Sequence, residues 1–224
     1  MMVQTMPSTD AILANLAAVA NQWQPLAIGW HVMTGALILA LLAGWRPSNR
    51  AAARIVTLPL FSVSGLAWTS DNPFNGTTFA VLALLLGWFA TGLSAERIRI
   101  PSPPVIIPAV FLLAFGWTYP HFLATDRWTT YLYAAPFGLL PCPTLSALIG
   151  VTLIFGLFDS VVWPSTLALF GVAYGIIGVF RLGVALDVAL LAGAGVLGVL
   201  CLSSAFPRSR PSRAAPTSRG LMAR

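Results

Sequence analysis

Long apolar runs without a charged residue constrain this chain more than any other feature. Residues 25–45 read PLAIGWHVMTGALILALLAGW, and similar runs recur as far as residue 204. About 18 or more such residues are enough to cross the hydrocarbon core of a bilayer as a helix. Backbone groups in lipid must be satisfied internally, which allows only helices or closed barrels, and these runs do not alternate as barrel strands do. The sequence therefore predicts an all-α fold, a polytopic bundle of transmembrane helices.

The composition agrees with a lipid environment. Of the residues, 58% are hydrophobic and 8% are charged, whereas soluble domains average about 25% charged. All 12 basic residues are arginine, which is typical of a GC-rich bacterial genome. We therefore expect a multi-pass protein of the cell inner membrane, with the lipid bilayer as its main partner. No nucleic-acid partner is predicted, because the arginines follow membrane topology.

The runs divide the chain into about seven spans and two terminal segments. Residues 1–24 are predicted to form an amphipathic interfacial helix, with an extension of the first span as the alternative. Residues 25–204 form the predicted transmembrane domain, and 205–224 a disordered basic cytoplasmic tail. The predicted spans are 25–45, 53–69, 77–94, 103–119, 128–156, 161–180 and 183–204.

The arginines support this count. With the N-terminus outside and the C-terminus in the cytoplasm, only Arg127 and Arg181 lie outside, and cytoplasmic loops are expected to carry the Arg excess. Splitting 128–156 into two crossings would spoil this separation. The tail is predicted to bind anionic lipid headgroups. The cytoplasmic arginines would be Arg46, Arg50, Arg54, Arg97, Arg99, Arg208, Arg210, Arg213, Arg219 and Arg224.

Small residues in the last two spans allow close helix contact. Gly171 and Gly175 form a G-x-x-x-G pattern, and Ala185, Ala189 and Gly193 form a stripe. We expect these residues to pack within one chain. A homo-oligomer or a larger membrane complex is the alternative.

The few polar residues in or near the spans are the candidate functional residues. An ionisable group inside lipid is costly and is a functional candidate by default. Asp187 would lie about 7–8 Å into the last span, and His31 at a similar depth in the first. The pattern indicates an outward-facing vestibule or an ion or proton site. The alternative is that Asp187 pairs with an arginine or a histidine only to hold helices together. The outer set is Asp187, His31, His121, Asp126, Arg127 and Arg181.

The span 128–156 is predicted to be interrupted. It contains PFGLLPCPTLS, in which Pro136, Pro141 and Pro143 each remove a backbone donor. We expect a helix that restarts with Cys142 at its cap and Pro143 at its first position, so that partial positive charge lies at Cys142 and Thr144. A kinked, fully packed helix with an inert thiol is the alternative.

A second break is predicted at Pro59, inside the span 53–69. Interrupted helices in matching positions of two opposed halves are typical of transporters.

These features favour transport or exchange of a small solute or ion. The alternatives are an accessory or assembly subunit of a membrane complex and a membrane thiol-redox protein. Two His and two Cys without paired spacing do not indicate a metal, and no cofactor is predicted. Phosphate-loop, nucleophile-elbow and zinc-protease motifs are absent, so no catalytic residue is assigned.

The stretches YPHFLATDRWTTYLYAAPFGLLPCPTLSALIG and GVFRLGVALDVALLAGA, with ANQWQP near the start, resemble a family of small bacterial multi-pass membrane proteins of unknown function. This resemblance implies a membrane location and a helical fold. It brings no substrate and no site residue.

Overall fold

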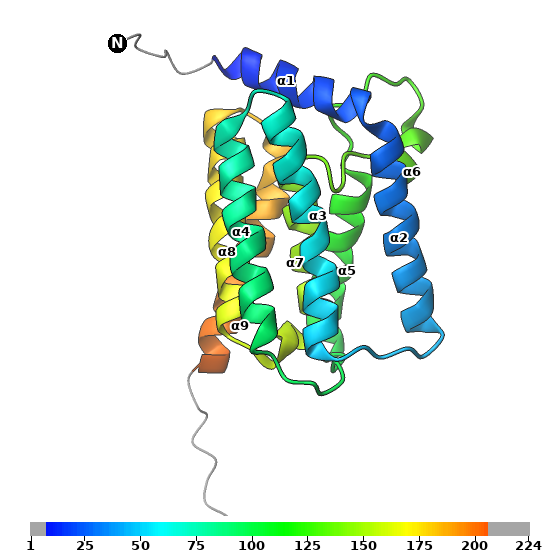
Figure 1. Ribbon diagram of the computed structural model, residues 1–224, viewed down its shortest axis with the longest axis vertical. Helices are drawn as coiled ribbons and strands as arrows, with labels where there is room; N and C mark the ends of the chain where they lie inside the picture. The colour runs from blue at the N-terminus through cyan, green and yellow to red at the C-terminus, as the bar shows by residue number, and fades with distance from the viewer. Residues whose placement is uncertain (1–7, 206–224) are drawn as a thin grey trace, which may run out of the picture.

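The computed structural model describes residues 8–205, and these residues form a helical bundle without a β-strand (Figure 1). The predicted all-α fold is confirmed for this part of the chain. The longer helices are α1 Thr9–Gln22, α2 Gln24–Leu42, α3 Asn49–Thr69, α4 Pro73–Thr91, α5 Pro103–Thr118, α7 Pro141–Ile154, α8 Val162–Ile176 and α9 Val188–Ala205. The short elements are η1 Trp128–Thr130, α6 Tyr131–Ala134, η2 Gly156–Asp159, η3 Ile177–Arg181 and η4 Ala185–Asp187.

Within residues 8–205, five helical segments are long and apolar enough to cross a membrane. They are α2, α3, α4, α8 continued to Arg181, and α9 with its preceding turn. The other two predicted spans correspond to α5 and α7, which are apolar but shorter. The 14 residues of α7 cover about 21 Å, so the count of seven crossings stays a prediction. Of the predicted tail, all residues after 205 lie outside the described part.

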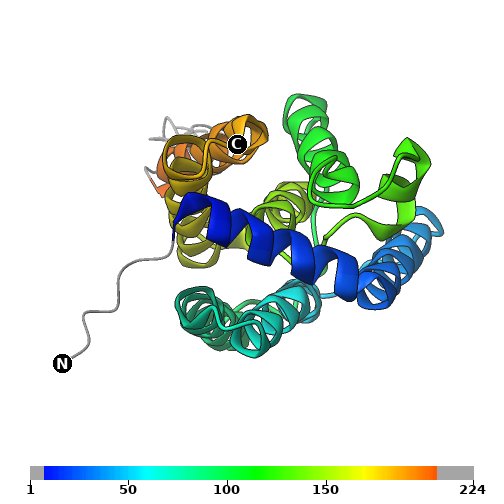
Figure 2. The ribbon, with the colours of Figure 1, turned by 90° about the horizontal axis from the view of Figure 1, so that it is seen from above.

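Helix α7 occupies the centre of the bundle. Seen from above, it is surrounded by α3, α5, α8 and α9, while α2 stands at the periphery (Figure 2). Every residue of α7 is buried except Cys142 and Ile154, which are partly exposed. Nearly the whole surface of α7 therefore contacts protein.

Glycines allow α5 and α7 to pack backbone to backbone. A Cβ added at Gly150 would lie 2.5 Å from the backbone nitrogen of Leu113, and one at Gly116 would lie 2.5 Å from that of Ala147. Small residues at such contacts permit the close approach that stabilises helix pairs in membranes. Sequence analysis placed its small-residue contacts in the last two spans and missed this one.

The small residues that were singled out also pack within the chain. Gly171 and Gly175 of α8 lie against α9, where added Cβ atoms would meet Ala194 and Leu191. The predicted stripe on α9 is only partly right. Gly193 faces α5, but Ala185 is exposed and Ala189 half-buried. The buried face of α9 is formed by Leu190, Ala194, Leu197 and Cys201.

Helix α1 lies across one end of the bundle (Figures 1 and 2). The chain turns at Trp23, so α1 is a helix of its own and not an extension of α2. The Asn15 side-chain amide donates to the carbonyl of Ser70, 2.7 Å away, in the turn between α3 and α4. The Asn21 side chain donates to the carbonyl of Phe122 and accepts from the amide of Ala124. These bonds tie α1 to two loops.

The described arginines separate between the two ends of the bundle, as predicted. The connections α2–α3 and α4–α5 meet at the end opposite α1, where the amide of Asn49 donates to the carbonyl of Glu96. This arginine end carries Arg46, Arg50, Arg54, Arg97 and Arg99. The end covered by α1, the α1 end, has Arg127 in a loop and Arg181 at the end of η3.

The predicted break at Pro59 is wrong. Helix α3 is continuous from Asn49 to Thr69 with Pro59 inside it. In transmembrane helices, neighbouring helices and hydroxyl side chains can compensate for the donor that a proline removes. The packing of α3 against α4 supplies such support.

We expect Gly150→Val to lower the stability of the bundle by about 1–3 kcal/mol, because the added side chain meets backbone atoms that cannot move aside. Thermal unfolding of the purified protein in detergent would measure the effect. Gly65→Val in α3 is the matched control, since nothing lies within 4 Å of a Cβ at Gly65. Equal melting temperatures for the two variants would contradict the close α5–α7 packing.

Candidate functional site

Asp187 lies at the irregular junction between α8 and α9. The chain leaves α8 through the π-helical turn η3, reverses at Gly183 with φ of 70°, and enters α9 through η4. Asp187 is the last residue of η4 and is 2% exposed. Asp187 therefore lies at the start of the last helix, whereas the sequence predicted a position several residues inside it. Single π-helical turns occur frequently at functional sites.

Gly178 makes room for the Asp187 side chain. A Cβ at this position would collide with Oδ2 of Asp187. The carbonyl of Gly178 accepts a hydrogen bond of 2.9 Å from the amide of Val184, which fixes the turn. Position 178 of η3 therefore requires glycine, because a side chain there would occupy the space of the Asp187 carboxyl group.

Two neutral side chains contact Asp187, and together the three residues form what we call the Asp187 site. The hydroxyl of Tyr119 donates a 2.7 Å hydrogen bond to Oδ1 of Asp187. The thiol of Cys142 also interacts with the carboxyl group. Tyr119 directly follows α5 and is fully buried, while Cys142 lies in the first turn of α7. The site therefore joins the ends of α5, α7 and α9.

The alternative in which Asp187 pairs with an arginine is not what the structure shows. Arg181 is exposed, and its guanidinium donates to the hydroxyl of Thr9 in α1. Within residues 8–205, the only ion pair joins Arg99 and Glu96 at the arginine end. His121 is exposed but close enough to act electrostatically on Asp187.

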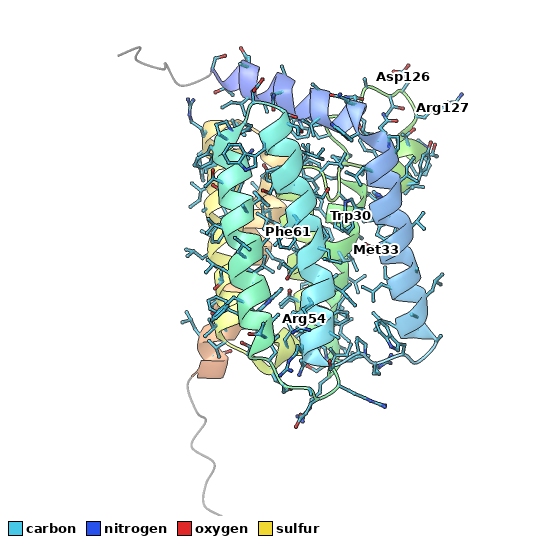
Figure 3. The ribbon with its side chains drawn as sticks, in the orientation of Figure 1. Trp30, Met33, Arg54, Phe61, Asp126 and Arg127 are labelled. Carbon is cyan, nitrogen blue, oxygen red and sulfur yellow. The ribbon has the colours of Figure 1, made fainter. Side chains whose placement is uncertain are left out.

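Asp126 and Arg127 do not reach this site. Both lie on an exposed loop after α5, and Figure 3 shows them beyond the outer edge of the bundle. These two residues lie at the α1 end, as Asp187 does, but they are not part of the Asp187 site.

The break in the span 128–156 is present, with one correction. Residues 135–140 connect α6 to α7, and Gly138 has φ of 77°. Leu140 is the cap of α7 and Pro141 its first residue, so Cys142 and Pro143 lie two positions further into the helix than expected. Pro136 belongs to the connection.

Thr144 holds this connection in place. Its hydroxyl donates to the carbonyl of Leu140, 2.7 Å away, and accepts from the amide of Gly138, 2.9 Å away. Thr144 is also fully buried. The side chain thus stabilises the start of α7 and does not face the Asp187 carboxyl group.

His31 belongs to a different cluster. Its ring nitrogens lie 2.8 Å from the carbonyl oxygen of Ala27 and 2.9 Å from that of Trp117. The ring packs edge-on against Trp117, with the ring centroids 4.8 Å apart. His31 therefore fastens α2 to the end of α5, and the outer polar set divides into two groups.

Sequence analysis missed two tyrosines and an asparagine near the α1 end. Besides Tyr119, the hydroxyl of Tyr174 in α8 donates to Oδ1 of Asn75 in α4, 2.9 Å away. Buried polar residues near the α1 end thus form a layer of two hydrogen-bonded pairs, Tyr119 with Asp187 and Tyr174 with Asn75. The sequence signal that could have identified these tyrosines is that tyrosine is scarce in the apolar runs.

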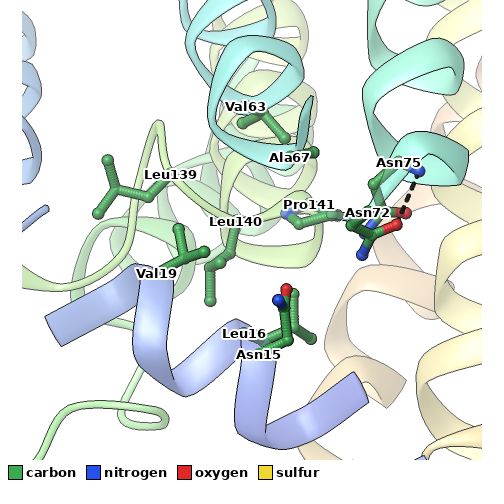
Figure 4. Close-up of a pocket in the computed structure, with 10 residues that line it drawn as sticks. All are labelled: Asn15, Leu16, Val19, Val63, Ala67, Asn72, Asn75, Leu139, Leu140 and Pro141. Carbon is green, nitrogen blue, oxygen red and sulfur yellow. Dashed lines mark hydrogen bonds between the residues drawn. The ribbon is translucent and has the colours of Figure 1, made fainter. Parts of the chain in front are cut away.

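A small pocket adjoins this layer beneath α1 (Figure 4). Asn15, Asn72 and Asn75 supply its polar lining, and the Asn72 side chain accepts from the amide of Asn75. Leu140 and Pro141 place the start of α7 at the same pocket. Pro141, which lines the pocket, thus directly precedes Cys142 of the Asp187 site.

Comparisons of the chain with known protein families, with characterised proteins and with solved structures found no match. The family resemblance of the sequence therefore stays a prediction. The roles of the residues above rest on their geometry.

We expect Tyr119→Phe to lower the free energy of unfolding by about 1.5–3 kcal/mol, because Asp187 loses its buried donor. Unfolding in detergent, with Tyr133→Phe as the exposed control, would measure this loss. Combining the change with Asp187→Asn in a double-mutant cycle should show coupling of about 0.5–3 kcal/mol. Additive effects would mean that the two groups do not interact.

Proposed function

We propose that this chain is a membrane protein that transports or exchanges a small cation or solute, and that Asp187 binds the transported ion or the coupled proton. The observation that carries this proposal is the buried carboxyl group of Asp187, whose contacts are a phenol and a thiol. A carboxyl group among neutral partners can take up and release a cation without separating an existing ion pair.

The backbone around Asp187 supports the same proposal. A π-helical turn precedes it, a 3₁₀ turn contains it, and α7 begins afresh beside it. Discontinuous helices at membrane depth are tolerated where backbone lines a protein interior or a cavity, and transporters use them to hold ions. Tyr119 and Cys142 would orient the carboxyl group, and His121 would act on it from the outer surface.

We further propose seven crossings, with the α1 end outside and the arginine end in the cytoplasm of the cell inner membrane. The separation of the arginines supports this orientation. Helices α5 and α7 would complete their crossings with the irregular residues that flank them.

The accessory-subunit alternative is favoured by one observation. The pocket beneath α1 does not have Asp187 or Cys142 on its wall, and neither does a second, apolar crevice that lies between α2, α3 and α7. The thiol-redox alternative has less support, because the other cysteine, Cys201, lies about 20 Å away from Asp187 along α9. Recovery of a stoichiometric partner in gentle detergent would favour the accessory role.

We expect the protein in liposomes to conduct protons, Na⁺ or K⁺, and we expect Asp187→Asn to abolish this flux. A trapped pH dye would report proton movement after an imposed potential, and an inward Na⁺ or K⁺ gradient would test exchange. Asp126→Asn is the matched control, since it removes an exposed carboxylate at the same end of the bundle.

Wild-type liposomes that match empty liposomes for all three ions would refute the proposed activity. A flux that is unchanged in Asp187→Asn would refute the assignment of the site. Elution of the variant as a single peak at the wild-type position in size-exclusion chromatography would show that it was tested in its folded state.

The orientation has a test of its own. A cysteine at Asp126 should react with a membrane-impermeant maleimide in intact cells, whereas a cysteine at Glu96 should react only after the inner membrane is opened. Both positions are exposed, at opposite ends of the bundle. The reverse labelling pattern would show that the arginine end faces outward.

A further inference from the structure

A narrow apolar crevice separates α2 from the rest of the bundle. It is lined by Met33, Thr34 and Leu37 of α2, by Ile55, Val56 and Pro59 of α3, by Phe137, and by Ala147, Leu148 and Val151 of α7. Figure 3 shows Met33 on the side of α2 that faces α3. Thr34 supplies the one polar side chain of this lining. The central helix α7 therefore forms the floor of a crevice that opens between two apolar helices.

The crevice exists because α2 is fastened to the bundle mainly through its first half. The buried residues of α2 are Ala27, His31 and Thr34. Near the same level, the indole of Trp30 donates to the hydroxyl of Ser62, 3.1 Å away. Beyond Thr34, no residue of α2 is fully buried.

The apolar walls of the crevice and their depth along the helices indicate what kind of molecule could bind there. Helices α2 and α3 are both long and apolar enough to span a membrane, and the crevice lies between their middle turns. Alkyl chains are what surrounds a protein at this depth. A flexible hydrocarbon chain fits walls of Met, Leu, Ile and Val, which offer dispersion contacts and almost no hydrogen bonds.

The arginine end supplies a site for a charged headgroup next to the crevice. The guanidinium of Arg46 donates to the carbonyl of Leu41 at the end of α2, 2.6 Å away. Leu41 lies one helical turn, about 6 Å, beyond the crevice residue Leu37. One guanidinium nitrogen of Arg46 donates to the carbonyls of both Leu41 and Trp45, and the group has five N–H donors suited to phosphate.

Arg54 adds a second positive charge on α3, beside the crevice residue Ile55. Its side chain is exposed, and no hydrogen bond or ion pair within residues 8–205 involves it. The arginines of the arginine end outnumber its acidic residues, Glu96 and Asp159.

We propose that this crevice binds one acyl chain of an anionic phospholipid, with the phosphate held by Arg46 at the arginine end. Binding of this lipid does not depend on the transport activity proposed above. The acyl chain would contact Phe137, which belongs to the connection that leads into α7.

The test is native mass spectrometry of the full chain in detergent, with added dioleoyl phosphatidylglycerol or dioleoyl phosphatidylcholine. We expect one phosphatidylglycerol to remain bound at concentrations at which phosphatidylcholine is lost. Ile55→Trp fills the crevice and should weaken this binding at least tenfold. Leu58→Trp is the matched control, because Leu58 is 46% exposed on the same helix and lies outside the crevice.

Arg46→Gln should reduce the preference for phosphatidylglycerol, whereas Arg127→Gln at the α1 end should not. If Ile55→Trp fails to fold, Leu37→Trp fills the crevice from the side of α2 and replaces it in the comparison. Equal retention of both lipids, or undiminished binding in the crevice-filling variant, would overturn the proposal.

Discussion

The backbone contact between α5 and α7 is the constraint on which the rest of this bundle depends. Gly116 and Gly150 bring the two helices so close that no side chain separates them. Helix α7 can then be enclosed on its other sides by α3, α8 and α9. Because α7 is too short to reach both ends of the bundle, its first turn lies inside the protein, where Cys142 meets Asp187 and Tyr119.

Apolar periodicity predicted the helices well because helix formation in lipid is a local property. The runs of uncharged residues located every long helix, and the prolines located the interruption before α7. The same rule failed at Pro59, where packing against α4 keeps α3 continuous. A residue that breaks a helix in isolation need not break one that its neighbours support.

The candidate site was only partly predictable, since its contacts join residues distant in sequence. Asp187 was chosen correctly as a buried carboxyl group, but its partner Tyr119 precedes it by 68 positions. No spacing rule connects two such residues. The arginines were the natural partners by charge, yet Arg181 faces α1 and Arg127 lies on an outer loop. Local patterns indicate roughly where along the chain a helix lies, whereas the direction of a side chain depends on how the helices pack.

Helix α1 has a mechanical consequence for the outer loops. Through Asn15 and Asn21 it holds the α3–α4 turn and the loop after α5, and through Thr9 it contacts Arg181 at the end of α8. These attachments act in parallel on one rigid rod. A displacement that keeps these bonds would therefore move the three segments together with α1, whereas the release of one segment alone would first have to break its bond to α1.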